Sequence, residues 1–300
     1  MGSIDHYMVR NAEQAKMARS ALAHHRATGA AWWETAISRV EPNVIEIRGY
    51  PIDELIGRLT YTEMLALLVI GRRLSPGEVG LLDAALVAGV DHGPRAPSIA
   101  AARMAATCGV SFNSAVATGI NMLGDHHGGA VEQFMELLHM LAEENPDDRP
   151  AMHETVRRTV ADYRAANTPV PGYGHQLHDR DPRRARMLDL LGRADGDGTI
   201  GGRYLLIALA VEAALGEAVG RELPLNVDGL SGIVYLELGF PAAVAKGLFS
   251  LSRGAGIVAH ALEEHERGSL IKGPCPPGED LVQYVGEPTR SLPASLPPSD

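Results

Sequence analysis

The stretch "PGYGHQLHDRDPRRA", from Pro171 to Ala185, interrupts a chain that otherwise has the periodicity of packed helices. Its opening proline and the glycines Gly172 and Gly174 predict a turn, because proline cannot continue a helix and glycine adopts backbone angles that other residues avoid. The turn presents His175, and Arg183 follows after an Asp-Pro pair. A solvated run of charges at the start of a helix is the alternative interpretation. The density of glycine, tyrosine and histidine beside the charges favours a functional turn.

The rest of the sequence is predominantly helical. The segment "YTEMLALLVIGRRL" (61–74) has an apolar face at helical spacing. The next helix is predicted to begin after Ser75, which forms a capping box with Glu78 around Pro76 at the first helical position. The segment "NVIEIRGY" (43–50) alternates apolar and polar residues as a strand does. The sequence therefore predicts an all-α fold with one small β-ribbon near the N-terminus. It contains no strand–GxGxxG–helix unit and no Walker loop, which disfavours a nucleotide-binding fold.

Length and charge restrict the possible partners. A chain of 300 residues predicts one large domain or two smaller domains that share a core. The formal net charge is −10, so nucleic acid is not expected as a partner, since phosphate binding needs a basic surface. An anionic ligand would have to be held by a local cluster of arginine and histidine.

The sequence also indicates a cellular setting. Its apolar runs stop short of the ~20 residues that a membrane-spanning helix needs, and its N-terminus lacks the apolar core of a secretory signal. Cys108 and Cys275 have no CxxC neighbour, so neither a disulfide framework nor a zinc cluster is indicated. Cys108 lies in a run of small residues and is expected to be buried. A reducing, cytoplasmic location without membrane contact is the expectation.

Two further stretches place histidines at the ends of predicted helices. "VAGVDHGPRAPS" carries Asp91 and His92, and "LGDHHGGAVEQ" carries Asp125, His126 and His127. A polar loop between helices and a helix break with satisfied histidines are the alternatives. Adjacent histidines suggest a metal, but neighbours in a chain point in different directions and rarely share one ion. No metal is therefore expected.

Two charges stand in otherwise apolar surroundings near the C-terminal end of the helical region. In "LPLNVDGLSGIVY", Asp228 would be partly desolvated, which raises the pKa of a carboxyl and makes it a stronger base. The alternative is an aspartate that caps the following helix. In "LSRGAGIVAH", Arg253 is one charge inside a helix of small residues. Its alternative is a side chain that reaches along the helix to solvent.

Together, and in this order, these stretches resemble the citrate synthase superfamily. "PGYGHQLHDRDPR" resembles that family's "PGYGH…DPR", "LGDHHGGAVEQ" its "GPLHGGANE", and "NVDGLSGIVY" its "NVD…SG". "DHGPRAPS…AAR" resembles "DHE…NAS…AAR", "LSRGAGIVAH" resembles "SRxxGxxAH", and "EIRGYPIDELIGRLTYTEMLALLVIGRRL" resembles "YRGYDIEDLA…FEEVAYLLLYGRLP". The resemblance spans roughly residues 46–270. Because the chain is short for a synthase, it looks more like the citryl-CoA lyase branch, which includes the C-terminal module of ATP-citrate lyase.

The resemblance implies an enzyme that makes or cleaves a carbon–carbon bond between the α-carbon of an acyl-CoA, such as acetyl-CoA, and the carbonyl of a 2-oxo acid, such as oxaloacetate. By this resemblance Asp228 would remove the α-proton, His127 would stabilise the enol, and His175 would polarise the carbonyl of the oxo acid. These residue types suit the chemistry, since a thioester α-proton is weakly acidic and needs a positioned base and charge stabilisation. The remaining implied roles are binding of the substrate carboxylates by His92, Arg183 and Arg253, and contact of CoA with the backbone of Val170, Pro171, Gly172, Tyr173 and Gly174.

The resemblance also implies an architecture. It predicts a large domain of residues 1–128 plus 243–300 and a small domain of residues 129–242, with the site in the cleft between them. Closure of the two domains would exclude water from the enolate. A homodimer is expected, with the Ala/Gly-rich segments 98–123 and 204–219 as candidate packing surfaces.

Two departures from the family pattern leave the substrate open. Asp125 and His126 replace the usual Pro-Leu, and the C-terminal arginine that crosses to the partner's site has no clear counterpart, since the comparable stretch carries Lys272. The same fold acting on a different oxo acid or acyl-CoA is therefore an alternative. A non-catalytic ligand-binding relative and a His/Asp metalloenzyme built on "GDHHGG" are two others. A binding protein would not need a base, so the presence of Asp228 favours an enzyme.

Overall fold

The computed structural model describes residues 12–29, 31–144, 149–174 and 181–275, together with residues 283, 285, 286 and 288 of the C-terminal tail. His175 lies outside the described residues. The chain separates into two compact units, residues 1–80 and 81–300. The predicted division into a large and a small domain stays a prediction. No helix in the described ranges combines the length and apolar character needed to cross a membrane.

The first unit contains the predicted ribbon. Its elements are α2 (Ala12–Thr28), β1 (Ser38–Glu41), β2 (Val44–Ile47), β3 (Tyr50–Pro51), α3 (Ile52–Leu55) and α4 (Tyr61–Ile70). The three strands form one antiparallel sheet in the order β1-β2-β3, in which Val40 pairs with Ile45. Arg39 on β1 donates to the carboxylate of Glu46 on β2 at 2.5 and 2.9 Å, a cross-strand ion pair. The prediction of a small N-terminal β-ribbon is confirmed.

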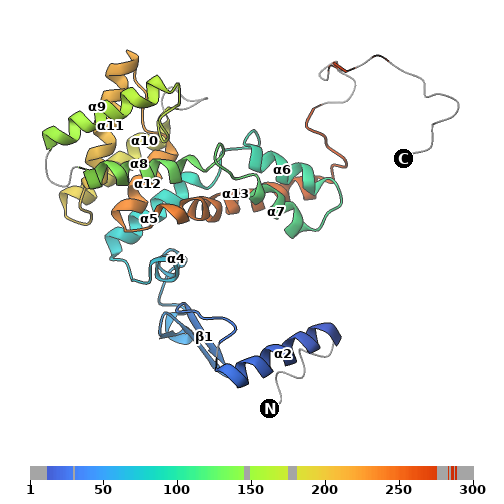
Figure 1. The fold of residues 1–300 in the computed structure, drawn as a ribbon. Coiled ribbons are helices and arrows are strands. Elements are labelled where there is room, and N and C mark those ends of the chain that lie inside the picture. Colours follow the sequence, from blue (N-terminus) through green and yellow to red (C-terminus); the bar gives the residue numbers. More distant parts are fainter. Residues whose placement is uncertain are drawn as a thin grey trace, which may run out of the picture. The chain divides into compact units, whose positions relative to one another are not determined.

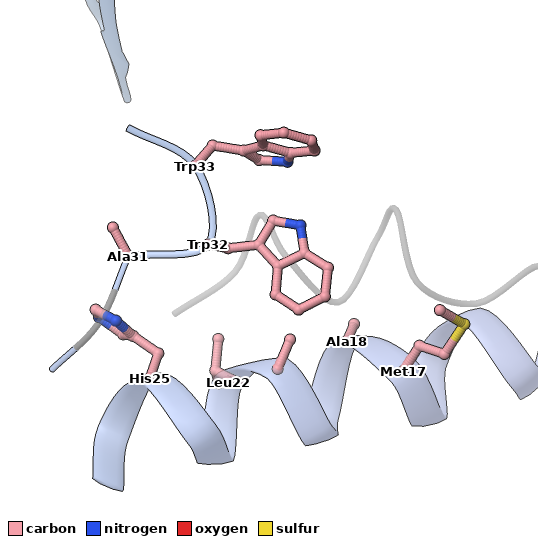
Figure 2. A pocket seen from close by; sticks show the side chains of 8 residues that line it. Met17, Ala18, Leu22, His25, Ala31, Trp32 and Trp33 are labelled. Carbon is pink, nitrogen blue, oxygen red and sulfur yellow. The ribbon is translucent and has the colours of Figure 1, made fainter. Parts of the chain in front are cut away.

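The first unit also has an open apolar groove of about 620 Å³ between α2 and the segment that follows it. Trp32 points toward α2, whose Met17, Ala18 and Leu22 line the groove (Figure 2). Trp32 is 67% exposed and Trp33 is 84% exposed, which is unusual for side chains of this size.

The predicted start of the next helix is also confirmed. Helix α5 (Pro76–Gly89) begins directly after Ser75. The Ser75 backbone N–H donates to Glu78 Oε2 at 2.7 Å, and the Glu78 backbone N–H donates to Ser75 Oγ at 3.3 Å. Two N–H groups that the helix leaves without a partner are thereby satisfied.

The second unit is a helical assembly (Figure 1). After α5 its elements are α6 (Pro97–Ala106), α7 (Phe112–Asn121), α8 (Ala130–Glu144), α9 (Arg149–Ala165), α10 (Pro182–Gly196), α11 (Arg203–Val219), α12 (Val227–Glu237), the short 3₁₀-helix η1 (Ala242–Val244) and α13 (Ala245–Arg267). Helices α6 and α7 pack on each other and along α13, while α8, α10 and α11 pack against α12. The all-α prediction is confirmed.

Helix α12 is the centre of this unit. Every residue from Gly229 to Leu236 is buried, and so is Val227. A helix that is apolar all round can only be covered by neighbours on all sides. Asp228 is the exception in the first turn of α12, because it is only half-buried. The carboxyl of Asp228 therefore lies at the N-terminal end of α12, at the edge of the core.

One expectation about the helices is wrong. Cys108 is exposed rather than buried. Helix α6 ends at Ala106, and Cys108 lies in the turn that follows, where its Sγ contacts the Met104 carbonyl oxygen at 3.3 Å. Burial in this run ends with Thr107, which is still buried, and the rest of the run is exposed from Cys108 onward.

Candidate active site

The turn at 171–174 is bound directly to the chain that enters α12. The Gly174 N–H donates to the Pro224 carbonyl oxygen at 2.8 Å, and the Asn226 N–H donates to the Gly172 carbonyl oxygen at 3.0 Å. Gly172 has a φ of +83°, and a Cβ there would lie 2.2 Å from Cδ2 of the Phe134 ring. Only glycine fits such a position. The turn is therefore fixed to its neighbours by both hydrogen bonds and packing.

Tyr173 points into the core. Its hydroxyl donates to the Ala208 carbonyl oxygen at 2.8 Å, and its ring centroid lies 5.8 Å from that of Phe134. Burial raises the pKa of the Tyr173 phenol well above its usual value, and the charge of Glu212 adds to this. The hydroxyl thus stays neutral and anchors the turn.

Asp228 is not the cap of α12, contrary to the alternative interpretation. The cap is Asn226, whose Oδ1 accepts the N–H groups of Asp228 at 3.0 Å and Gly229 at 3.1 Å. The carboxylate of Asp228 is left for another task. Its Oδ1 is buried and makes no hydrogen bond to any described residue. Burial raises the pKa of Asp228 to about 6, although the charges of Arg253 and Arg183 pull it down.

Arg253 is buried, with 3% of its surface exposed, so it does not extend to solvent. Its Nε donates to the Gly89 carbonyl oxygen at 2.8 Å, and its guanidinium carbon lies 4.9 Å from the centroid of the Phe249 ring. Burial lowers the pKa of Arg253, while the charges of Asp91 and Asp228 oppose this shift. An arginine keeps its charge under such a shift. The site therefore holds a fixed, desolvated positive charge.

Part of the Arg183 guanidinium binds Asp181, the residue that caps the same helix. Its Nη2 and Nε donate to the Asp181 carboxylate at 2.6 and 2.9 Å, and Nη1 donates to the Ala88 carbonyl oxygen at 3.2 Å. Asp181 caps α10 and is itself buried. Arg183 therefore stands at the site with its orientation already set by Asp181.

His127 lies in a tight loop before α8. The loop is closed by reciprocal backbone hydrogen bonds between Gly124 and His127 at 2.9 and 3.0 Å. On the ring, Nε2 lies 3.2 Å from the Ser98 backbone N and 2.9 Å from Ser98 Oγ. A backbone N–H can only donate, so Nε2 is an acceptor and the neutral ring carries its hydrogen on Nδ1. Burial lowers the pKa of His127, and the charges of Arg253 and His92 lower it further.

The loop that carries His127 is also tied to α13. Lys246 Nζ lies 2.5 Å from Asp125 Oδ1 and 2.8 Å from Glu132 Oε2. Asp125, which departs from the family's sequence, is thus an ion-pair partner. His126 is exposed. Among the residues that the structure describes, no group of three or more His, Cys, Asp or Glu is arranged to hold a metal ion.

The structure brings most of the predicted residues together. The charge of Arg253 acts on both His127 and Asp228, that of His92 acts on His127, and that of Arg183 acts on Asp228. His175 follows Gly174 and lies outside the described residues. Ser98 and Asp181 were missed by sequence reasoning, since a serine in a first helical turn and an Asp-Pro pair are common. His260 could have been predicted to lie on the same face of α13 as Arg253, because seven residues make about two helical turns.

This arrangement suits chemistry at a weak carbon acid. A half-buried carboxylate with a pKa of about 6 is mostly ionised at neutral pH and is more basic than an ordinary aspartate. A neutral imidazole that carries its hydrogen on Nδ1 can donate from that nitrogen to a developing oxyanion. Two guanidinium groups can bind carboxylates.

Comparisons with known proteins agree on one family. The family described as "Citrate synthase, C-terminal domain" matches residues 70–273. The citrate synthase of Haloferax volcanii is 30% identical over 206 residues, which are 68% of this chain and 50% of that protein. The chain thus spans about half the length of the curated relatives it matches, although it covers more of some solved structures.

Two solved structures are similar in fold and sequence. Citryl-CoA lyase from Hydrogenobacter thermophilus has a TM-score of 0.78 at 32% identity, with 88% of this chain and 98% of that chain covered. Citrate synthase from Thermoplasma acidophilum, in a ternary complex with carboxymethyl coenzyme A and oxaloacetate, has a TM-score of 0.64 at 25% identity, with 78% and 58% covered. The predicted family and fold are confirmed: the chain belongs to the citrate synthase family.

Proposed function

We propose that this chain makes or cleaves the carbon–carbon bond between the α-carbon of an acyl-CoA, foremost acetyl-CoA, and the carbonyl carbon of a 2-oxo acid, foremost oxaloacetate. The observation that carries the proposal is Asp228, whose buried Oδ1 has no hydrogen bond to a described residue and whose pKa is raised by burial to about 6. A buried carboxylate oxygen without a hydrogen-bond partner in the described part of the chain has no evident structural use.

In the condensing direction, Asp228 takes a proton from the α-carbon of the thioester. The electron pair of the broken C–H bond moves toward the thioester oxygen, where the Nδ1–H of His127 donates to the enolate. The α-carbon then attacks the carbonyl carbon of the oxo acid, and the carbonyl oxygen takes up a proton, for which His175 is the proposed donor. In the cleaving direction the same steps run in reverse, and protonated Asp228 returns the proton to the α-carbon.

The positive groups have a separate task. We assign the carboxylates of the oxo acid to Arg253, Arg183 and His92, because a desolvated guanidinium binds a carboxylate more strongly than an exposed one does. The backbone of Val170–Gly174 is assigned to CoA. It is held against α12 and α8 by hydrogen bonds and packing, which fix the position of the backbone that CoA would contact.

Cleavage of citryl-CoA is the favoured direction. The citryl-CoA lyase of Hydrogenobacter thermophilus is more similar to this chain, with a TM-score of 0.78 at 32% identity, than the citrate synthase of Thermoplasma acidophilum, with a TM-score of 0.64 at 25% identity. A different oxo acid or acyl group is the second candidate. It is favoured by Lys272, which takes the place of the expected C-terminal arginine but pairs with Glu264 at 3.3 Å within its own chain. We further propose a cytoplasmic homodimer, for which light scattering should give twice the chain mass of 31.9 kDa.

The test is solvent deuterium exchange into the α-position of acetyl-CoA and propionyl-CoA, with and without oxaloacetate, together with cleavage of citryl-CoA. Exchange that is lost in Asp228→Asn, with CoA binding retained, is the expected result. Exchange that persists in this variant would remove Asp228 from the role of base. A folded protein that neither exchanges these thioesters nor cleaves citryl-CoA would overturn the proposal and favour a ligand-binding relative.

A further inference from the structure

His260 on α13 joins two charged side chains from different elements. Its Nδ1 lies 3.1 Å from Nη1 of Arg103 on α6. Its Nε2 lies 3.3 Å from Oδ1 and 3.4 Å from Oδ2 of Asp91. The imidazole side chain is only 20% exposed. It therefore bridges α6 and the turn that immediately precedes His92.

The partners of His260 determine which ring nitrogen carries the hydrogen. An arginine guanidinium has donors and no acceptor, so Nδ1 of His260 must accept from Arg103. The hydrogen of the neutral ring is then on Nε2, from which it is donated to the Asp91 carboxylate. Arg103 is held in place by Glu263 at 2.5 Å and by the fully buried carboxylate of Glu264. Because Arg103 is fixed and donates to Nδ1, the hydrogen bond between His260 and Asp91 runs from Nε2–H to the carboxylate.

Asp91 in turn shapes the turn that carries His92. Its Oδ2 accepts the Gly93 N–H at 3.2 Å, and its charge acts on the guanidinium of Arg253. The turn is pressed against α13 at Gly256, where a Cβ would lie 2.4 Å from the Val90 carbonyl oxygen. Arg253, Gly256 and His260 follow one another along α13, and the last two lie against Val90 and Asp91.

We infer that His260 is a positioning residue for His92 and Arg253, which it holds in register through Asp91. The inference rests on the proposed function, in which these two residues bind the carboxylates of the oxo acid. His260 acts through its contact with Asp91 and is not assigned a contact with the substrate. Without the His260 bond, Asp91 keeps its charge and its bond to Gly93, but loses the contact that fixes its carboxylate relative to α13.

Two substitutions separate the ends of the imidazole. His260→Gln places an amide N–H near the position of Nε2 and so keeps a donor for Asp91. His260→Asn places a carbonyl oxygen near the position of Nδ1 and so keeps an acceptor for Arg103, but it loses the donor for Asp91. We expect His260→Asn to raise the KM for oxaloacetate and its Kd by calorimetry about tenfold, as for loss of a hydrogen bond to a charged group. The KM for acetyl-CoA should be unchanged, and His260→Gln should stay within about threefold of the wild type.

A double-mutant cycle tests the route through Asp91. In an Asp91→Ala background, His260→Asn should have no further effect on oxaloacetate binding. Equal loss in His260→Gln and His260→Asn, or a full additional effect in the Asp91→Ala background, would overturn the inference. Wild-type protein that binds oxaloacetate, with unchanged affinity in His260→Asn, would overturn this inference alone. Wild-type protein that binds no oxo acid would overturn it together with the proposed function.

Discussion

The side-chain amide of Asn226 donates to the carbonyl oxygen of Gly174 at 3.0 Å, so the residue that caps α12 also binds the glycine turn. The side-chain oxygen Oδ1 of Asn226 accepts the backbone N–H of Asp228. One residue therefore sets the distance between the turn assigned to CoA and the carboxylate assigned to the α-proton. A change in this side chain should affect catalysis and stability by separable amounts.

Asn226→Asp and Asn226→Ala test that separation. Aspartate keeps an acceptor for the helix N–H groups but replaces the donor to Gly174 with an oxygen that repels its carbonyl. Alanine loses both functions and should cost about 1–2 kcal/mol for the cap alone. We expect Asn226→Asp to bind CoA more weakly than the wild type and to lose some stability through the Gly174 contact, but less than Asn226→Ala, which also loses the helix cap. Equal CoA affinity in Asn226→Asp and the wild type would show that the hydrogen bond from Asn226 to Gly174 is not needed for CoA binding.

Asp228→Asn should stabilise the protein at neutral pH. The pKa of Asp228 is about 6 in the folded protein, against about 3.9 in an unfolded chain. Because the folded state binds this proton more tightly, the contribution of Asp228 to stability is most favourable below pH 3.9 and is lost as the pH rises through 6. The loss at pH 7 is at most about 3 kcal/mol, less what solvent screening removes.

Urea unfolding of wild type and Asp228→Asn between pH 5 and pH 8 measures this effect. The advantage of the variant should grow through pH 6 and level off above it. The rate of α-proton exchange in the wild type should rise through the same pH range, since only the carboxylate can act as base. Parallel stability curves for the two proteins would mean that the Asp228 carboxyl is better solvated than its surroundings indicate.

The site residues were predicted from local sequence context: Asp228 and Arg183 lie in the first turns of helices, and Arg253 is one charge inside a helix of small residues. Their roles stay a prediction. The capping box of Ser75 and Glu78 could be predicted from local spacing alone, and so could the turn at Gly172. The partners could not. Ser98 meets His127 only through the packing of α6 against the loop before α8, and no local pattern reports such a contact.

The alternative that stayed open at Asp228 and the error at Cys108 have the same origin. Sequence alone left open whether Asp228 caps α12, since aspartate and asparagine are both good caps. The structure gives the cap to Asn226, because the backbone of the 171–174 turn binds that residue and fixes where the helix starts. Cys108 was expected to be buried from its small neighbours, but the position of a helix end decides exposure, and helix ends are the least certain part of a sequence-based prediction.

Gly172→Ala should be far more damaging than Gly174→Ala. Both glycines have positive φ, at +83° and +77°, so alanine is strained in similar measure at either site, by about 1–2 kcal/mol. They differ in surroundings: the added Cβ would meet Phe134 at 2.2 Å in one case and Leu223 at 3.7 Å in the other. The difference between their unfolding free energies therefore reports the overpacking, expected at about 1–3 kcal/mol. Equal losses would mean that the Phe134 ring moves aside without cost.

Lys246→Met should affect catalysis more than stability. Lys246 bridges Asp125 in the His127 loop and Glu132 in the first turn of α8, and exposed ion pairs of this kind contribute little to folding. Their loss frees the loop, however, and a small misplacement of a catalytic group is costly to the rate. We expect kcat to fall about tenfold with little change in the KM for the acyl-CoA. Lys246→Arg should keep most of the wild-type kcat, since arginine keeps the charge.

High salt should lower the wild-type kcat toward that of Lys246→Met, because salt screens the two ion pairs of Lys246. A kcat that is unchanged in Lys246→Met would show that Gly124 and the backbone bonds of the loop suffice to hold His127.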